Sequence, residues 1–360
     1  MTQILNPQAG GYAAAITPLK TSYRIDSIDL LRGLVMIIMA LDHTRDFFHA
    51  EAMVADPLNL TTTTPALFFT RWITHFCAPV FVFLAGTSAF FQKARKTKKD
   101  LSGFLISRGL WLVVIEVVVI NFAFSFNPDY SLIGLQTIWA IGISMILLGV
   151  FIWLPYPVIF ALGLIIILGH NSLDFYEDGK PRGSFSVLYS LLHVQGFFPL
   201  GENRNLLVMY PFLSWTGLML CGYSFGKLFS MYEGVQRRKV LTWLGLGVIG
   251  FFIVLRATNI YGNPEDWTTQ KNAFYTFLSF IDTHKYPPSL LYMSMTIGPA
   301  ILFIAWVGNT KTALAKFITV YGRVPFFYYV LHFFLIHLLS TIAFVARGHS
   351  LSEPTPQDLG

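Results

Sequence analysis

The feature that most constrains this chain is a succession of apolar runs, each close to the length that crosses a lipid bilayer. A transmembrane α-helix needs about 20 mostly apolar residues. We predict nine such spans, over residues 28–48, 66–91, 103–125, 131–154, 156–170, 206–229, 239–258, 288–307 and 324–346. Because a backbone in lipid must satisfy its own hydrogen bonds, the predicted fold is an all-α bundle of membrane helices.

Composition removes the competing classes of protein. Charged residues make up 12% of the chain and apolar residues 54%, whereas soluble domains contain roughly 25% charged residues. A chain with so few charges cannot cover its surface with polar groups, which excludes a disordered chain, a disulfide-stapled secreted scaffold and a nucleic-acid binder. Cys77 and Cys221 both lie within apolar runs, so we expect them to be buried free thiols.

The distribution of basic residues predicts the orientation. With the N-terminus in the cytoplasm, the inner segments contain 16 of the 25 Lys and Arg residues but only four of the 19 acidic residues. Cytoplasmic loops carry this excess of positive charge, so we predict a cytoplasmic N-terminus. We expect residues 1–23 to form a tail without a signal-peptide pattern, residues 24–346 the membrane domain, and residues 347–360 a polar tail.

The first span carries the densest set of charges. Arg32 and His43 are 11 residues apart, which in a helix places them within about 20° of one face and roughly 16 Å apart along the axis. Four polar residues share a face at the outer end, at positions i, i+3, i+4 and i+7: Asp42, Arg45, Asp46 and His49. Carboxylates beside a histidine fix its tautomer and raise its basicity, as a general base requires. The candidate catalytic residues are therefore His43, Asp42, Asp46 and His49.

These charges also have a structural interpretation. Arg45 and Asp46 fit equally well a salt-bridged helix end that reaches the membrane surface. His43 lies one turn deeper in the membrane, beside Asp42, where an ionised side chain without a function or partner costs more free energy. We therefore favour a functional role for His43.

Ionisable residues inside other spans cost free energy unless they are paired or hydrated. His75, four residues before Pro79, either lines a cavity or binds a neighbouring helix. Glu116 either contacts a ligand or a proton path, or joins two helices through hydrogen bonds. Tyr329 and His332 belong to a polar patch in the last span. The spacing of the histidines and cysteines matches no metal motif, so we expect no metal.

Four stretches contain sequence motifs that their hydropathy alone does not explain: SIDLLRGL at 27–34, LDHTRDFF at 41–48, KYPPSLL at 285–291 and YGRVPFFYY at 321–329. Arg32, followed after ten residues by His43, looks like the arginine–histidine motif on the first span of integral-membrane acyltransferases. Together the stretches resemble the bacterial branch of the heparan-α-glucosaminide N-acetyltransferase catalytic-domain family, over residues 24–346.

The resemblance implies an enzyme of the bacterial inner membrane that transfers an acyl group from cytoplasmic acyl-CoA to an amine or hydroxyl of a sugar on the far side, with acetyl as the expected acyl group. Acetyl-CoA is the expected acyl donor, and a glycan or amino sugar is the expected acceptor. Arg32 would hold the CoA phosphates with other basic residues. The further candidates for binding the donor are Arg323, His75, Glu116, Tyr329 and His332.

Two points of the resemblance stay open. The lysosomal member carries an amide at the position of His43, and its histidine falls in the following outer loop, so either His43 or His49 is the base or acyl carrier. Members also usually carry another span after the segment of Tyr328 and His332. The resemblance therefore raises the expectation of a tenth span that this chain, ending in a polar tail, does not contain.

Two other classes of protein share this composition. A transporter or flippase for a small polar or glycan substrate would use Glu116, the second span with its proline and the long outer loops 171–205 and 259–287, although no internal repeat supports it. If the protein were a membrane scaffold, the free-energy cost of placing Asp42, His43 and Glu116 in membrane spans would have no explanation. Membrane lipid is an expected partner and nucleic acid is not. The sequence leaves four points open: the acceptor, the acyl length, direct or ping-pong transfer, and association into a homo-oligomer.

Overall fold

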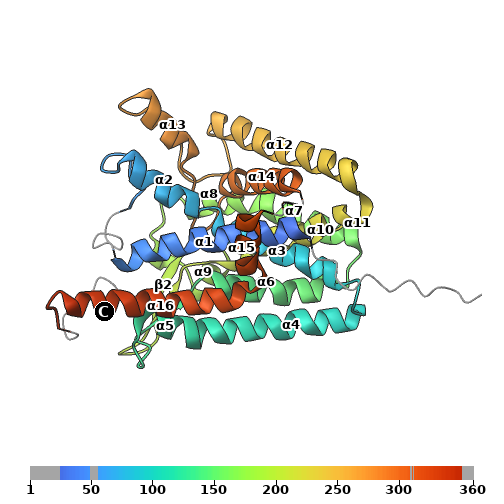
Figure 1. Ribbon diagram of the computed structural model, residues 1–360. Coiled ribbons are helices and arrows are strands. Elements are labelled where there is room, and N and C mark those ends of the chain that lie inside the picture. The colour runs from blue at the N-terminus through green and yellow to red at the C-terminus, as the bar shows by residue number, and fades with distance from the viewer. Residues whose placement is uncertain (1–24, 49–55, 309, 311, 351–360) are drawn as a thin grey trace, which may run out of the picture.

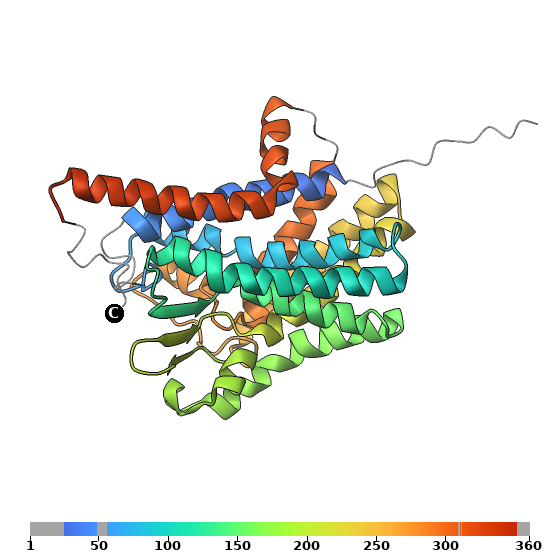
Figure 2. The same cartoon turned by 90° about the horizontal axis from the view of Figure 1, so that it is seen from below.

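The computed structural model describes residues 25–48, 56–308, 310 and 312–350. The long helices run side by side in one bundle (Figure 1 and Figure 2). The α-helices are α1 (Asp26–Phe48), α2 (Pro65–Thr74), α3 (Cys77–Gln92), α4 (Lys98–Val114), α5 (Asn121–Ser125), α6 (Thr137–Phe151), α7 (Tyr156–Gly169), α8 (Asp174–Glu177), α9 (Val187–Leu192), α10 (Phe212–Gly226), α11 (Leu228–Met231), α12 (Gly234–Thr258), α13 (Ala273–Ile281), α14 (Leu290–Val307), α15 (Ala313–Arg323) and α16 (Pro325–Ala346). A π-helical segment, Ile115–Ile120, joins α4 to α5, and short 3₁₀ segments cover His170–Leu173 and Arg182–Ser184.

Within the described residues, six helical stretches are long and apolar enough to cross a membrane: Pro65–Gln92, Lys98–Ser125, Tyr156–Glu177, Gly234–Thr258, Leu290–Val307 and Pro325–Ala346. Every predicted span contains a helix, but three of these helices are not among the six. α1 carries six charged residues, and α6 and α10 contain 15 residues each. The chain is thus a helical membrane protein, while nine spans and a cytoplasmic N-terminus stay predictions.

The fold is mostly helical, as predicted, with one small sheet at one end of the bundle. Its strands are β1 (Leu132–Leu135), β2 (Gly196–Pro199) and β3 (Asn205–Val208). β3 lies between the other two, parallel to β1 and antiparallel to β2. The apolar runs of β1 and β3, predicted as parts of spans, are extended because their backbone groups pair with each other. The side chain of Asn121 also fixes β1: its Nδ2 donates to the carbonyl of Gly134 (3.0 Å), and the N–H of Gly134 donates to its Oδ1 (2.6 Å).

The second predicted span is interrupted between α2 and α3. Pro79 lies in the first turn of α3, where its missing N–H leaves no gap in the helix. The carbonyl of His75, four residues earlier, accepts a hydrogen bond from the hydroxyl of Tyr292 (2.8 Å). Pro79 has no N–H to donate to this carbonyl, and a neighbouring helix satisfies it instead.

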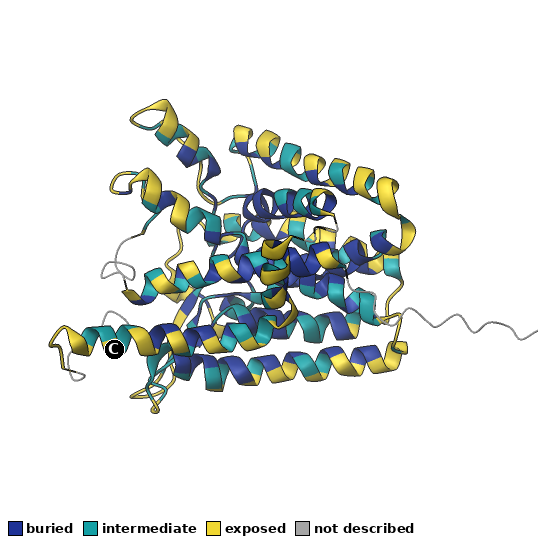
Figure 3. Cartoon of the chain, viewed as in Figure 1, coloured by how far each residue is buried: buried dark blue, intermediate teal, exposed yellow. Residues whose placement is uncertain are grey.

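Glycines let helices approach closely at two crossings. A Cβ on Gly222 of α10 would collide with the carbonyl of Phe83 in α3, and a Cβ on Gly322 of α15 would collide with the carbonyl of Asp29 in α1. α15, which the sequence did not predict as a helix, projects from the bundle at the second crossing (Figure 2). Burial is concentrated in α3, α10 and α14, whereas α12 and α16 keep broad exposed faces (Figure 3).

The loop 259–287, predicted to lie on the outer side, contains the apolar helix α13. Leu278 and Ile281 of α13 pack in a small apolar cluster with Phe68 of α2 and Phe252 of α12. Arg256 of α12 secures the loop, because its guanidinium donates to the carbonyls of four residues: Glu265, Ser279, Phe280 and Asp282. α13 therefore caps the side of the bundle and does not line the cavity described below.

Candidate active site

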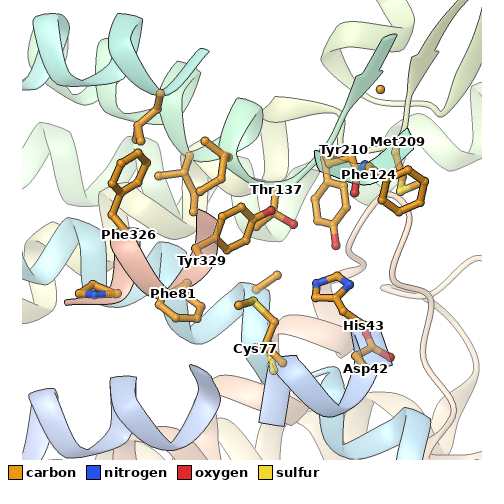
Figure 4. A pocket seen from close by; sticks show the side chains of 18 of the residues that line it. Asp42, His43, Cys77, Phe81, Phe124, Thr137, Met209, Tyr210, Phe326 and Tyr329 are labelled. Atoms are coloured by element: carbon orange, nitrogen blue, oxygen red, sulfur yellow. The ribbon is translucent and has the colours of Figure 1, made fainter. Parts of the chain in front are cut away.

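A cavity of about 720 Å³ lies inside the bundle. Its wall comes mainly from α1, α3, α4, α6, α16, the sheet and the turn before α14 (Figure 4). Within the described parts of the chain, its charged lining comprises six basic side chains and two carboxylates: Arg32, Arg45, Arg71, Arg108, Lys285 and Arg323, with Asp42 and Asp46. This excess of positive charge favours an anionic ligand.

Arg32 lies at one end of the cavity, near the start of α1; we call this the inner end and the opposite one the outer end, after the predicted orientation. Its guanidinium donates to Oδ1 of Asp29 (3.0 Å), to a carbonyl oxygen of α15 (3.2 Å) and to Oγ of Ser88 on α3 (2.8 Å). Asp29 lies three residues before Arg32, so both side chains are on the same side of α1. Arg108 and Arg323 line the same cavity. Arg32 is therefore a fixed element of the wall, and it joins three helices.

At the outer end, Asp42 and Asp46 form an ion-pair network with two arginines. Asp42 accepts from Nη1 of Arg71 through both carboxylate oxygens (2.9 Å each) and lies 2.8 Å from Nη2 of Arg45. Asp46 also accepts from Arg45 (2.8 Å). Asp42 is thus bound on two sides by arginines and anchors α2 to α1.

His43 lines the cavity one residue beyond Asp42. Its Nδ1 lies 3.4 Å from Oδ2 of Asp46, and its ring packs 4.3 Å from the ring of Phe333, centroid to centroid. A proton on Nδ1 facing Asp46 leaves the lone pair of Nε2 available as a base. Asp46, one turn away on the same helix, is the carboxylate that faces Nδ1 of His43.

The polar patch predicted in the last span lies beside His43. The His332 ring is 5.2 Å from the His43 ring and stacks on Tyr328. Its Nδ1 lies 3.0 Å from the carbonyl of Tyr328. Tyr329 lines the cavity, and His332 lies behind the wall. Of this pair, only Tyr329 is placed to touch a ligand.

His75 and Glu116 are both buried, and neither lines the cavity. The π-helical segment places Glu116 beside the start of α6, where its Oε2 accepts the backbone N–H of Trp139 (3.0 Å). A carboxyl group at a helix N-terminus satisfies donors that the helix leaves open. This geometry matches the structural alternative for Glu116, a joint between helices. The predicted catalytic residue His49 lies outside the described residues.

Several residues of the wall were not expected as site residues. Arg71, Lys285 and Tyr210 line the outer part of the cavity, and Figure 4 shows Tyr210 and His43 on facing walls. Lys285 and its neighbour Tyr286 begin the KYPPSLL stretch, which the sequence marked as a motif. Because this motif is far from α1 in the sequence, no residue spacing predicted that the two would line one cavity. Of the two cysteines, Cys77 is buried against the cavity and Cys221 is half-buried; both are free.

One cluster of metal-ligand type lies away from the cavity. The ligand atoms of Asp174, Glu177 and His193 are within 4.8 Å of one another. His193 Nδ1 is 2.6 Å from Oε1 of Glu177, which also accepts from the hydroxyl of Tyr189. His193 Nε2 faces Nδ1 of His170 at 3.1 Å. Hydrogen bonds within the cluster thus account for its arrangement.

Comparison with known proteins identifies the family. Residues 24–261 match the family described as heparan-alpha-glucosaminide N-acetyltransferase, catalytic. The match covers α1 to α12 and ends before Lys285 and Tyr329, short of the expected boundary at residue 346. A search of curated proteins found no match. The matched part includes Arg32, His43 and Asp46 and two thirds of the chain, so the protein belongs to the heparan-alpha-glucosaminide N-acetyltransferase catalytic family of membrane acetyltransferases.

Proposed function

We propose that this protein transfers an acetyl group from cytoplasmic acetyl-CoA to the amine or hydroxyl of a sugar on the opposite side of the bacterial inner membrane. The observation that carries the proposal is the cavity, because it is lined by arginines at one end and by His43 with Asp46 at the other. We also propose that the end containing Arg32 faces the cytoplasm. The basic segments 93–99 and 227–239 gather at that end of the bundle, on the right in Figure 1.

The inner end suits the phosphates of the donor. Arg32, Arg108 and Arg323 line it, and a guanidinium group binds phosphate oxygens through paired hydrogen bonds. The acyl-pantetheine arm, which is narrow and mostly uncharged, would extend from there toward His43. The two ends are roughly 16 Å apart along α1, from the rise of 1.5 Å per residue over eleven residues.

The outer end suits general-base catalysis. Nε2 of His43 would accept the proton of the acceptor amine or hydroxyl as that nitrogen or oxygen attacks the thioester carbon. Collapse of the tetrahedral intermediate breaks the carbon–sulfur bond, and the imidazolium returns the proton to the departing thiolate. Asp46 keeps the proton on Nδ1 and stabilises the imidazolium that forms. In a ping-pong route, His43 would instead carry the acetyl group itself.

Turnover of radiolabelled acetyl-CoA by the purified protein tests this assignment. His43→Ala is expected to lower kcat by about 10²- to 10⁴-fold, the usual contribution of a general base. His49→Ala separates the two histidines that the sequence left open. Unchanged turnover in both variants would contradict the assignment. Uptake of a glycan into proteoliposomes without acetyl-CoA would instead favour a transporter.

A further inference from the structure

The charges at the outer end of the cavity do not balance. Among the residues that the structure describes, three cations line it, Arg45, Arg71 and Lys285, and two carboxylates, Asp42 and Asp46. Asp42 is paired with both arginines, and Asp46 is paired with Arg45 and faces His43. Among the described residues, no carboxylate lies within ion-pair distance of Lys285. Lys285 is therefore a third cation beside two carboxylates. Its ammonium group lies over the ring of Tyr286, with Nζ 5.1 Å from the ring centroid, and acts on Asp42 from beyond ion-pair distance.

Lys285 is also withdrawn from bulk solvent. The residue is 8% exposed, yet it lines the cavity. A buried ammonium group without a counterion costs several kcal/mol, so such groups are usually paired or hydrogen-bonded. An anion that enters with a ligand would remove this cost.

The surrounding turn holds Lys285 in place. Asn263 accepts the backbone N–H of His284 (2.8 Å) and the hydroxyl of Ser289 (2.9 Å) through its Oδ1. The N–H of Ser289 donates to the carbonyl of His284 (3.0 Å), and Nε2 of His284 lies 2.9 Å from the carbonyl of Tyr286. Residues 284–289 thus form a braced turn that directs the lysine to the cavity.

The neighbouring phenol senses an uncancelled positive field. Burial raises the pKa of Tyr286, but Lys285, Arg71 and a hydrogen bond with Tyr210 together lower that pKa below its ordinary value. The charge of Asp42 acts in the opposite direction and does not cancel their combined effect. The field therefore remains available to a ligand.

We propose that Lys285 forms a subsite for an anionic substituent of the acyl acceptor, a carboxylate, phosphate or sulfate group. This inference rests on the proposed function, which assigns the outer end to the acceptor. The donor does not supply the anion, because its phosphates would lie at the inner end with Arg32. One negative charge beside Lys285 would give the outer end three cations and three anions.

Binding of three amino sugars to the purified full-length protein tests the subsite. The probes are glucosamine, which has no anionic group, glucosamine 6-phosphate and muramic acid, which carries a carboxylate. Calorimetry is expected to show that the wild type binds at least one anionic probe about tenfold more tightly than glucosamine. Lys285→Gln should abolish this preference, Lys285→Arg should keep most of it, and the exposed control Lys271→Gln should leave it unchanged.

Equal affinity of the wild type for all three probes overturns the inference, and so does a preference that persists in Lys285→Gln. The wild-type comparison decides the matter even if a variant does not fold. Acetyl transfer from acetyl-CoA is measured on the same preparations. Transfer without an anion preference removes the subsite alone, whereas an anion preference without any transfer contradicts the proposed function alone.

Discussion

Two carboxylates one turn apart on α1 have different partners and should therefore have different effects when they are removed. Asp46 faces Nδ1 of His43 at 3.4 Å, whereas Asp42 is bound by Arg45 and Arg71. We expect Asp46→Asn to lower kcat about tenfold or more, because the amide no longer stabilises the imidazolium. The KM for acetyl-CoA should not change, since its phosphates bind elsewhere. Steady-state kinetics on the purified variant measures both.

Asp42→Asn is the matched comparison. This change leaves Arg71, which is partly buried, without its carboxylate and leaves Arg45 with Asp46 alone. We expect it to lower the free energy of unfolding by about 3 kcal/mol. Thermal unfolding in detergent measures the loss. If Asp46→Asn were the less stable variant and Asp42→Asn the less active one, the roles given to the two residues would be reversed.

Asp282 gives the outer loop a pH dependence. Burial, together with the charges of Asp56 and Glu265, raises the pKa of Asp282 to about 7. The unfolded chain releases this proton near pH 4, so between about pH 4 and pH 7 the folded state holds the extra proton. The contribution of Asp282 to stability is therefore full below pH 4 and is lost as the pH rises to 7.

Asp282→Asn removes the loss of stability that Asp282 causes between pH 4 and pH 7. We expect the variant to exceed the wild type in melting temperature at pH 8 and to match it at pH 4. Asp178→Asn, at an exposed position of the other outer loop, is the control. A melting-temperature difference that is the same at both pH values would show that Asp282 does not titrate in this way.

At the residue scale, the sequence predicted what depends on one regular helix. Arg32, Asp42, His43 and Asp46 all line the same cavity because α1 is an uninterrupted helix of 23 residues. Lys285 could not be predicted as part of the wall, since its position depends on a turn held by Asn263. For Glu116, the sequence indicated that a carboxylate within the span costs free energy. It did not indicate which group donates a hydrogen bond to that carboxylate, because the donor is a backbone N–H at the start of another helix.

At the scale of elements, the close crossing of α3 and α10 is the packing feature most open to test. Gly222→Val would place a side chain against the carbonyl of Phe83. We expect this change to separate the helices and to lower the free energy of unfolding by about 2 kcal/mol or more, the usual cost of overpacking. Thermal unfolding of the detergent-solubilised variant measures the effect.

Gly247→Val on α12 is the control, because a Cβ at this position meets no atom within 4 Å. Its melting temperature should stay close to that of the wild type. An equal loss in both variants would mean that helix propensity, and not the crossing, explains the effect of Gly222→Val.

The sequence predicted the secondary-structure elements whose positions depend on hydropathy alone. Each apolar run contains a helix, but β1 and β3 are extended because their partner strands and Asn121 supply their hydrogen bonds. The second span breaks just before Pro79, and not at it, since proline is accommodated in the first turn of α3. Such boundaries depend on partners distant in the sequence.

At the scale of the whole molecule, the distribution of charge links the fold to the proposed reaction. Basic residues gather at one end of the bundle and continue into the cavity, whose other end holds His43 and Lys285. The chain thus combines a membrane fold with a charged path inside it. The central claim is that a donor and an acceptor on opposite sides of the membrane meet in this path.

Reconstituted proteoliposomes test that claim most directly. Radiolabelled acetyl-CoA, which does not cross lipid, is supplied outside, and glucosamine or muramic acid is enclosed in the lumen. We predict that acetylated sugar accumulates in the lumen with the wild type and stays at background with His43→Ala. Product found only outside when the sugar is supplied there, or equal rates in both proteins, would contradict the account.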